Sequence, residues 1–172
     1  MANTDSVFSR KCSFSRYRYV AATHFEPTGA RLAFPCWDEP AIKAPFEITI
    51  INSASYKAVI SNMKETNKTV ANGMLTTTFN VTPPMSTYLV AFVVSDYESN
   101  EHNSSEMLFR VWTKPRSISQ TKYALSVGQQ LLEKMEDYTD IKFSRFIPKM
   151  DQVSLRDFSA GAMENWGLVT YR

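Results

Sequence analysis

The chain has 172 residues, of which 44% are hydrophobic and 13% aromatic, and its formal net charge is +2. This composition excludes an intrinsically disordered protein, and the absence of a basic stripe makes nucleic acid an unexpected partner. No run of eighteen apolar residues exists, and residues 1–10 lack the apolar core of a signal peptide, so neither a transmembrane helix nor a signal peptide is expected. The two cysteines, Cys12 and Cys36, allow at most one disulfide, which only their number favours.

Residues 17–94 predict β-structure. Phe46, Ile48 and Ile50 alternate with other residues as in a half-buried strand, and Asn72-Gly73 is typical of a tight hairpin turn. Many short strands with turns between them favour an antiparallel sandwich or saddle. The predicted strands are residues 17–23, 46–52, 56–60, 74–81 and 88–94.

The pattern changes after a predicted strand at residues 108–112. Ser117 and Gln120 predict a capping box that opens a helix ending near Asp140. We expect Gly128 to permit close packing of this helix. Its apolar residues at helical spacing are Tyr123, Val127, Leu131, Met135 and Tyr138, with Leu132 beside them.

Two more strands are predicted at residues 149–155 and 167–171. The expected fold is therefore α+β, and we place a domain boundary near residue 110, which gives domains 1–110 and 111–172. In the first domain, Asp38 and Glu39 are expected to serve as turn and capping groups, with Arg31 paired to one of them. Trp37, Trp112 and Trp166 are expected in the core.

One carboxylate, Glu164, lies on the connection between the last two predicted strands, among small residues. Gly161 and Ala162 leave the backbone bare enough for a second extended chain to lie against it. A carboxylate beside such an edge suits a site for the ammonium end of a peptide. The alternative is a plain hairpin in which Glu164 is satisfied within the fold.

The sequence Gly161–Gly167 (GAMENWG) resembles the exopeptidase signature of the gluzincin zinc aminopeptidases, the family of aminopeptidase N. Two further blocks resemble the same family: residues 23–40, which contain THFEPTGAR and FPCWDEP, and residues 85–92, MSTYLVAF. The resemblance runs from about Tyr17 to Arg172. It implies a partial N-terminal β domain followed by the first strand-helix-strand part of a thermolysin-like catalytic domain.

The resemblance also assigns substrate-binding residues. It implies that Glu164 binds the free α-amine of a peptide and that Glu26 reaches the same amine. His24 stands where the family usually has Gln, at the pocket for the first side chain; a packed, neutral histidine is the alternative. The full set of expected substrate-binding residues is His24, Glu26, Gly161, Ala162, Met163, Glu164 and Asn165.

The family's zinc is bound by a His-Glu-x-x-His helix that follows the GAMEN motif. This chain has only two histidines, His24 and His102, and neither is in that pattern. We therefore expect a fragment of a zinc metalloaminopeptidase without zinc ligands and without activity of its own. Its expected partners are peptides with a free N-terminus and the missing remainder of the catalytic domain. The alternative is a non-catalytic peptide-binding or adhesion module.

Three N-glycosylation sequons begin at Asn67, Asn80 and Asn103. Together they favour an extracellular or plasma-membrane glycoprotein as the parent enzyme, with a cytoplasmic enzyme as the alternative. Asn80 is the weakest of the three because it falls inside a predicted strand.

Overall fold

The computed structural model describes residues 7–12, 18–104 and 107–172, so Tyr17, at the start of the first predicted strand, lies outside it. The chain divides into two compact units, and it passes from the first to the second between Asp96 and Tyr97. The predicted strand at 108–112 belongs to the second unit. Where the two domains of a parent enzyme divide, near residue 110 or elsewhere, stays a prediction. The two units are described separately below.

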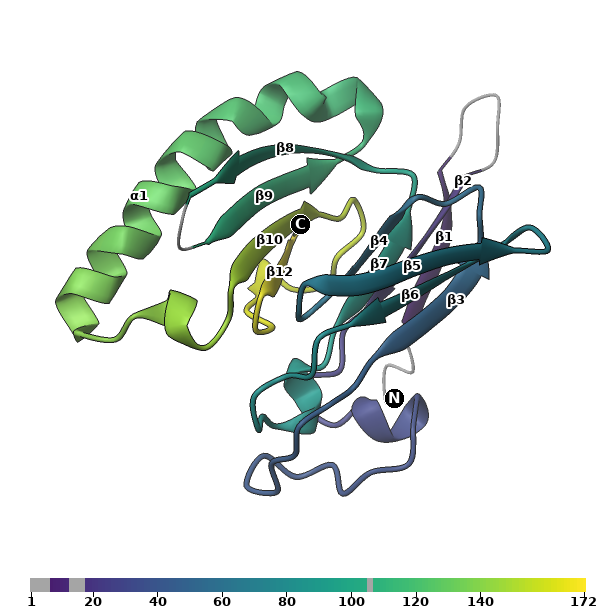
Figure 1. The fold of residues 1–172 in the computed structure, drawn as a ribbon, viewed down its shortest axis with the longest axis horizontal. Helices are drawn as coiled ribbons and strands as arrows, with labels where there is room; N and C mark the ends of the chain where they lie inside the picture. Colours follow the sequence, from purple (N-terminus) through teal and green to yellow (C-terminus); the bar gives the residue numbers. More distant parts are fainter. Residues whose placement is uncertain (1–6, 13–17, 105–106) are drawn as a thin grey trace. The chain divides into compact units, whose positions relative to one another are not determined.

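Every strand pair of the first unit is antiparallel, as predicted. A four-stranded sheet has the order β1-β2-β7-β4, and a three-stranded sheet has the order β3-β6-β5. Short 3₁₀ helices lie at Ala30–Leu32 and Thr87–Leu89. The strands, labelled in Figure 1, are β1 (Val7–Cys12), β2 (Arg18–Thr23), β3 (Thr49–Ser53), β4 (Ala58–Ser61), β5 (Glu65–Ala71), β6 (Met74–Phe79) and β7 (Phe92–Ser95).

Local sequence explains the β5–β6 hairpin. Asn72 and Gly73 both have positive φ, 51° and 75°, as a two-residue turn between twisted strands requires. Leu75, Thr77 and Phe79 of β6 are buried while the residues between them are more exposed, as in a strand with one face on a core. The turn and a strand beginning at Met74 were predicted from the sequence and are confirmed.

The sequence misplaced or missed other strands of this unit. The strand predicted at 46–52 begins only at Thr49, although Phe46, Ile48 and Ile50 are the half-buried residues of the alternation, as expected. The strand predicted at 88–94 is a 3₁₀ turn followed by β7. Strands β1 and β5 were not predicted. β5 (ETNKTVA) is an exposed edge strand, so it needs no apolar face and carries no alternating signal.

The second unit is one mixed sheet with a helix. Its order is β11-β12-β10-β9-β8, and β10 pairs in parallel with both β9 and β12. Helix α1 connects the parallel strands β9 and β10, as a parallel connection requires (Figure 1). The elements are β8 (Glu98–Asn103), β9 (Leu108–Thr113), α1 (Thr121–Thr139), β10 (Lys149–Ser154), β11 (Ala162–Met163) and β12 (Leu168–Tyr171), with 3₁₀ helices at Pro115–Gln120 and Phe143–Arg145. The predicted α+β class is confirmed.

The helix ends where predicted and begins later. Asp140 closes it in a left-handed conformation, with φ 55°. Its first residue is Thr121, and the predicted capping residues Ser117 and Gln120 belong to a preceding 3₁₀ helix without a side-chain cap, so the capping-box prediction was wrong. Gly128 does permit close packing, because a Cβ there would stand 2.8 Å from Cζ of Phe109 on β9.

The apolar stripe of α1 does not face the sheet. Tyr123, Leu131 and Tyr138 are 77%, 60% and 85% exposed. Met135 is 55% exposed as well, whereas Val127 of the stripe and Leu132 beside it are half-buried. The other buried or half-buried positions are Thr121, Leu125, Gly128, Gln129 and Glu136. The periodicity correctly predicted a helix, but tertiary packing turned a more polar and smaller face toward the sheet.

Candidate functional site

The GAMENWG segment forms a β-hairpin in the second unit. Met163 of β11 pairs with Thr170 of β12, and the backbone N–H of Arg172 donates to the carbonyl of Gly161 at 3.1 Å. Residues 164–167 are the tip. β11 is the outermost strand of the sheet, so one side of its backbone is not paired within the described chain.

The predicted substrate-binding residues of this hairpin divide by exposure. Gly161, Ala162 and Glu164 are exposed, and the space where Gly161 would carry a Cβ is open. Met163 and Asn165 are 1% exposed and hold the hairpin in the core. The Nδ2 atom of Asn165 is buried without a hydrogen-bond partner among the described residues. The chain therefore forms the hairpin of the alternative interpretation, but with its carboxylate facing solvent.

The tip is fixed by its own backbone and by the neighbouring strand. The N–H of Leu168 donates to the carbonyl of Asn165 at 3.0 Å, and Gly167 has φ 72°, a conformation that glycine adopts without strain. The carbonyl of Gly167 accepts from the N–H of Asp151 at 3.0 Å and from Nζ of Lys149 at 2.7 Å. Two donors from β10 thus converge on the last residue of the tip.

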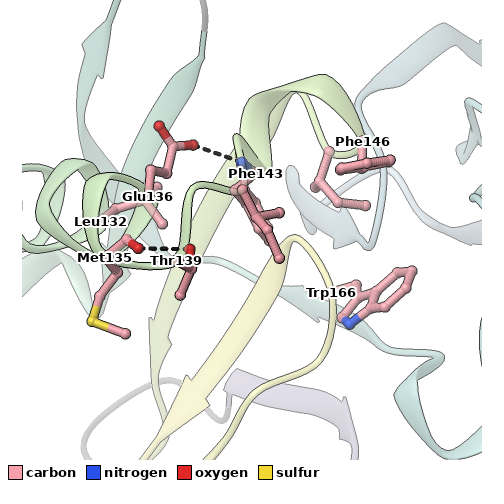
Figure 2. A pocket seen from close by; sticks show the side chains of 9 residues that line it. Leu132, Met135, Glu136, Thr139, Phe143, Phe146 and Trp166 are labelled. Carbon is pink, nitrogen blue, oxygen red and sulfur yellow. Dashed lines mark hydrogen bonds between the residues drawn. The ribbon is translucent and has the colours of Figure 1, made fainter.

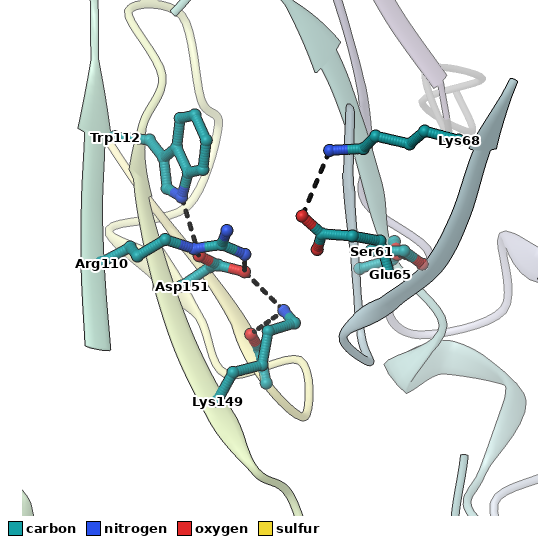
Figure 3. A network of polar contacts seen from close by, with 9 residues as sticks. Ser61, Glu65, Lys68, Arg110, Trp112, Lys149 and Asp151 are labelled. Atoms are coloured by element: carbon teal, nitrogen blue, oxygen red, sulfur yellow. Dashed lines mark hydrogen bonds and ion pairs between the residues drawn. The ribbon is translucent and has the colours of Figure 1, made fainter. Parts of the chain in front are cut away.

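A buried charge network lies behind this anchor (Figure 3). Lys149 and Asp151 are both 0% exposed, and their Nζ and Oδ2 atoms are 2.5 Å apart. Arg110 donates to both oxygens of Asp151, from Nε at 2.5 Å and from Nη2 at 2.9 Å. The indole N–H of Trp112 donates to Oδ1 at 2.7 Å, and the Arg110 guanidinium lies 5.0 Å from its ring centroid. Sequence reasoning did not find this network.

The network determines the charge of its carboxylate. Complete burial acts to raise the pKa of Asp151, but the Lys149 ammonium and the hydrogen-bonded Arg110 guanidinium outweigh it and hold the pKa below its ordinary value. Asp151 therefore stays ionised at neutral pH. A buried carboxylate that is paired twice and hydrogen-bonded is a rigid support for the strands around it.

An apolar pocket of about 430 Å³ opens between the end of α1, residues 141–147 and Trp166 of the GAMENWG segment (Figure 2). The one carboxylate among the lining residues is that of Glu136, which is buried. It accepts hydrogen bonds from the backbone N–H of Phe143 at 2.7 Å and from Nζ of Lys142 at 3.3 Å. Trp166 is half-buried and lines this pocket, so it is not the fully packed core residue that was expected.

The other predicted site residues, His24 and Glu26, follow β2 in the first unit. Phe25 between them is 0% exposed and contacts the edge of Phe34, with ring centroids 6.0 Å apart, so it fixes the segment in the core. Nε2 of His24 lies 4.0 Å from a carboxylate oxygen of Glu26. The imidazole is 14% exposed and the carboxylate side chain 52%, so Glu26 is the more accessible group.

The FPCWDEP turn is built around Asp38, which is 5% exposed. The Asp38 carboxylate accepts hydrogen bonds from the backbone N–H of Arg31 at 3.1 Å and from its Nε at 3.3 Å. It also accepts a hydrogen bond from the hydroxyl of Thr87 at 2.5 Å. Burial acts to raise the pKa of Asp38, but these hydrogen bonds and the Arg31 charge lower it overall. The predicted pairing with Arg31 is confirmed.

One prediction in the same turn is wrong. Trp37 is 78% exposed, so it is a surface residue and not part of the core. Cys36 is a free, half-buried thiol, so it does not form the disulfide that the number of cysteines left open. Burial, followed by the nearby Asp38 carboxylate, raises the pKa of the Cys36 thiol.

Among residues 7–12, 18–104 and 107–172, no three His, Cys, Asp or Glu side chains stand together as metal ligands would. The described part of the chain therefore does not fit a zinc ion. The same residues include no helix long and apolar enough to cross a membrane. The sequon residues Asn67, Asn80 and Asn103 are exposed, and Asn80 follows β6 rather than lying inside it.

Comparison with known proteins identifies the family. The Peptidase M1 N-terminal domain matches residues 10–89, and the Peptidase family M1 domain matches residues 123–172. The chain belongs to peptidase family M1. This agrees with the aminopeptidase N-like resemblance of the GAMENWG segment and of the block at residues 23–40.

The relatives that this M1 chain resembles are aminopeptidases. It is 46% identical over 155 residues to the alanine/arginine aminopeptidase of Saccharomyces cerevisiae, which is 90% of this chain and 18% of the relative. It is 47% identical to human endoplasmic reticulum aminopeptidase 1 and 46% identical to the membrane alanyl aminopeptidase of Manduca sexta, in each case over 90% of this chain and 16% of the relative. The chain thus spans less than a fifth of the length of these relatives.

Proposed function

We propose that this M1 chain is a fragment of a zinc metalloaminopeptidase and carries the clamp that binds the free α-amine of a peptide substrate. Glu164 supplies the carboxylate of this clamp, and the family resemblance assigns the same role to Glu26, which lies in the first unit. The observation that carries the proposal is that Glu164 is exposed at the tip of the β11–β12 hairpin, and that β11 is the open edge strand of its sheet.

The chemistry of the hairpin supports a peptide ligand. An extended peptide that adds to β11 forms main-chain hydrogen bonds along Gly161 and Ala162, which are exposed and carry little or no side chain. Its ammonium group then meets Glu164, and each charge-assisted hydrogen bond contributes about 1.5–3 kcal/mol. A blocked N-terminus lacks that charge and is rejected. His24, beside Glu26, borders the first side chain.

The metal belongs to the remainder of the catalytic domain, which is the proposed partner of this chain. Zinc there would polarise the scissile carbonyl and activate water. The described residues contain no metal-ligand group, so no step of hydrolysis is assigned to them. We accordingly expect the 172-residue chain to bind no stoichiometric zinc and to hydrolyse no aminoacyl amide.

The parent is proposed to be an extracellular or plasma-membrane glycoprotein. The exposed sequon asparagines support this location, as do the names of two relatives, which place one in the endoplasmic reticulum and describe another as a membrane enzyme. Mass spectrometry of the protein from its native source, before and after glycosidase treatment, tests it.

The amine clamp is tested in the enzyme that contains this chain together with a zinc helix. Reading the coding frame beyond Arg172 shows whether a His-Glu-x-x-His helix follows. Glu164→Gln keeps the size of the side chain and one acceptor oxygen but removes its charge. We expect it to lower kcat/KM about ten- to hundredfold for substrates with a free amine, with normal zinc content.

Two results would contradict the clamp. One is a Glu164→Gln enzyme that loses its metal while it still distinguishes free from acetylated N-termini, because Glu164 would then support the metal. The other is a stop codon directly after Arg172 in the native transcript, which would favour a non-catalytic peptide-binding or adhesion module.

A further inference from the structure

We propose that Lys149 is a positioning residue of the amine clamp: its buried ammonium holds the hairpin tip and thereby sets where Glu164 stands. This inference rests on the proposed function, because it assigns a means of placing the carboxylate that binds the amine. Lys149 itself touches no substrate.

The geometry of the tip carries the argument. Glu164 is the first residue of the tip and Gly167 the last, and only Asn165 and Trp166 separate them. Lys149 donates to the carbonyl of Gly167 at 2.7 Å, while the backbone of Asp151 donates to the same oxygen at 3.0 Å. The backbone N–H is an ordinary contact between β10 and β12. The Lys149 ammonium is an additional, charged donor that sheet pairing does not require.

The burial of Lys149 shows that this contact is not incidental. A lysine that is 0% exposed has given up hydration that an ammonium retains at the surface. An apolar side chain of the same length would fill the space without that cost. What the ammonium adds at this position is a hydrogen bond to the tip and a charge beside Asp151, which Arg110 and Trp112 hold in place from β9.

The consequence reaches Glu164 through a short and rigid path. The tip closes on itself through the Leu168 N–H and the Asn165 carbonyl, and Asn165 is 1% exposed. The segment between the anchored Gly167 carbonyl and Glu164 therefore has little freedom while the Lys149 bond is present. Without that bond, the tip keeps one donor from β10 and gains room to move. The strength of the ion pair with an amine depends on where the Glu164 carboxylate is held. A tip that holds it less rigidly therefore binds an amine less tightly.

The experiment uses the 172-residue chain with Lys149→Met, which keeps the length of the side chain and removes the donor. The first readout is amide hydrogen exchange measured residue by residue. We expect the acceleration of exchange in Lys149→Met, relative to the wild type, to be at least about tenfold larger for the Asp151 and Leu168 amides than for the β8–β9 amides. Val153→Ala is the matched control: Val153 is on the same strand and 0% exposed, but it makes no polar contact with the tip. It should accelerate exchange across the whole sheet.

The second readout is the binding of L-leucinamide, monitored through the amide resonances of residues 161–167. N-acetyl-L-leucinamide, whose amine is blocked, is the control ligand. We expect Lys149→Met to weaken the binding of leucinamide about tenfold. It should add nothing further in a Glu164→Gln background, because coupled residues are not additive. Val153→Ala should weaken binding equally with and without Glu164→Gln.

The outcomes separate the inference from the function on which it rests. A wild-type chain that binds both amides equally overturns the amine clamp, and the exchange data then decide alone whether Lys149 positions the tip. Uniform acceleration across the sheet in Lys149→Met, as in Val153→Ala, overturns the positioning role. If Lys149→Met does not fold, Lys149→Leu, which also lacks a donor, is used and the same two amides are read; an unchanged exchange rate there overturns the proposal.

Discussion

Each unit of this M1 chain contains an arginine–aspartate pair, and the two pairs are built differently. In the first unit, Arg31 and Asp38 are seven residues apart, and the arginine side chain is 53% exposed while the aspartate side chain is 1% exposed. In the second unit, Arg110 and Asp151 are 41 residues apart and 10% and 0% exposed. The first pair shapes a local turn, and the second joins two strands of a sheet.

The difference concerns what each carboxylate loses when its partner is removed. Asp38 keeps the Thr87 hydroxyl and one backbone N–H, and water can reach the arginine side of the pair. Asp151 and Lys149 have no exposed surface, so no solvent replaces a lost partner. We therefore expect the second unit to be far more sensitive to changes of charge than the first.

The largest effect is expected for Asp151→Asn, which leaves Lys149 and Arg110 around an uncharged amide whose NH₂ group faces donors. Removing one partner of a buried charge pair costs about 3–5 kcal/mol. The measurement is the opening free energy of β9 and β10 from amide hydrogen exchange, read separately from the first unit. A loss below about 1 kcal/mol would show that the network contributes little to stability.

Acidification removes the same charge without a substitution. The pKa of Asp151 is lower in the folded chain than its ordinary value of 3.8, so its contribution is complete above that value and is lost as the pH falls through the folded pKa. We expect the opening free energy of β9 and β10 to fall as the pH is lowered below about 4. Asp151→Asn should flatten this dependence; an equally steep acid limb in the variant would assign it to other carboxylates.

A smaller effect is expected for Asp38→Asn in the first unit. The amide can still accept the Thr87 hydroxyl, but it loses the charge that attracts Arg31, for which we expect about 1.5–3 kcal/mol. Exchange of the Arg31 amide, which donates to Asp38, measures the loss. A loss as large as that of Asp151→Asn would remove the contrast between the two pairs.

The smallest effect is expected for Arg31→Met, which keeps the side-chain stem and the backbone N–H bond to Asp38. A pair that is half-exposed on one side contributes about 0–1 kcal/mol. Urea unfolding of the first unit, followed by its amide resonances, should show a change within that range. A larger loss would mean that the Arg31 guanidinium also holds the turn through the Asp38 carbonyl, which it contacts at 3.0 Å.

Local sequence also predicted much of the candidate site. The bare backbone at Gly161 and Ala162 and the strands on either side of Glu164 were predicted from residues close together in the chain, whereas the exposure of the Glu164 side chain was not. The support of the tip could not be predicted this way. Lys149 and Asp151 are charged residues that a hydrophobic pattern places at the surface. Their burial is explained by their pairing with each other and by the pairing of Asp151 with Arg110, which lies 41 positions earlier in the chain.

The sequence by itself determined the strands of β6 and β10, the Asn72-Gly73 turn, the end of α1 and the family, because each depends on residues close together in the chain. Only the tertiary structure decided which face of α1 meets the sheet and which charges are buried. Gly128 allows α1 to approach Phe109, and that close approach selects the smaller face over the apolar stripe. The charge network likewise forms because β9 and β10, which precede and follow α1 in the chain, become paired neighbours in the sheet. Burial and pairing are properties of the folded neighbourhood, which no local pattern encodes.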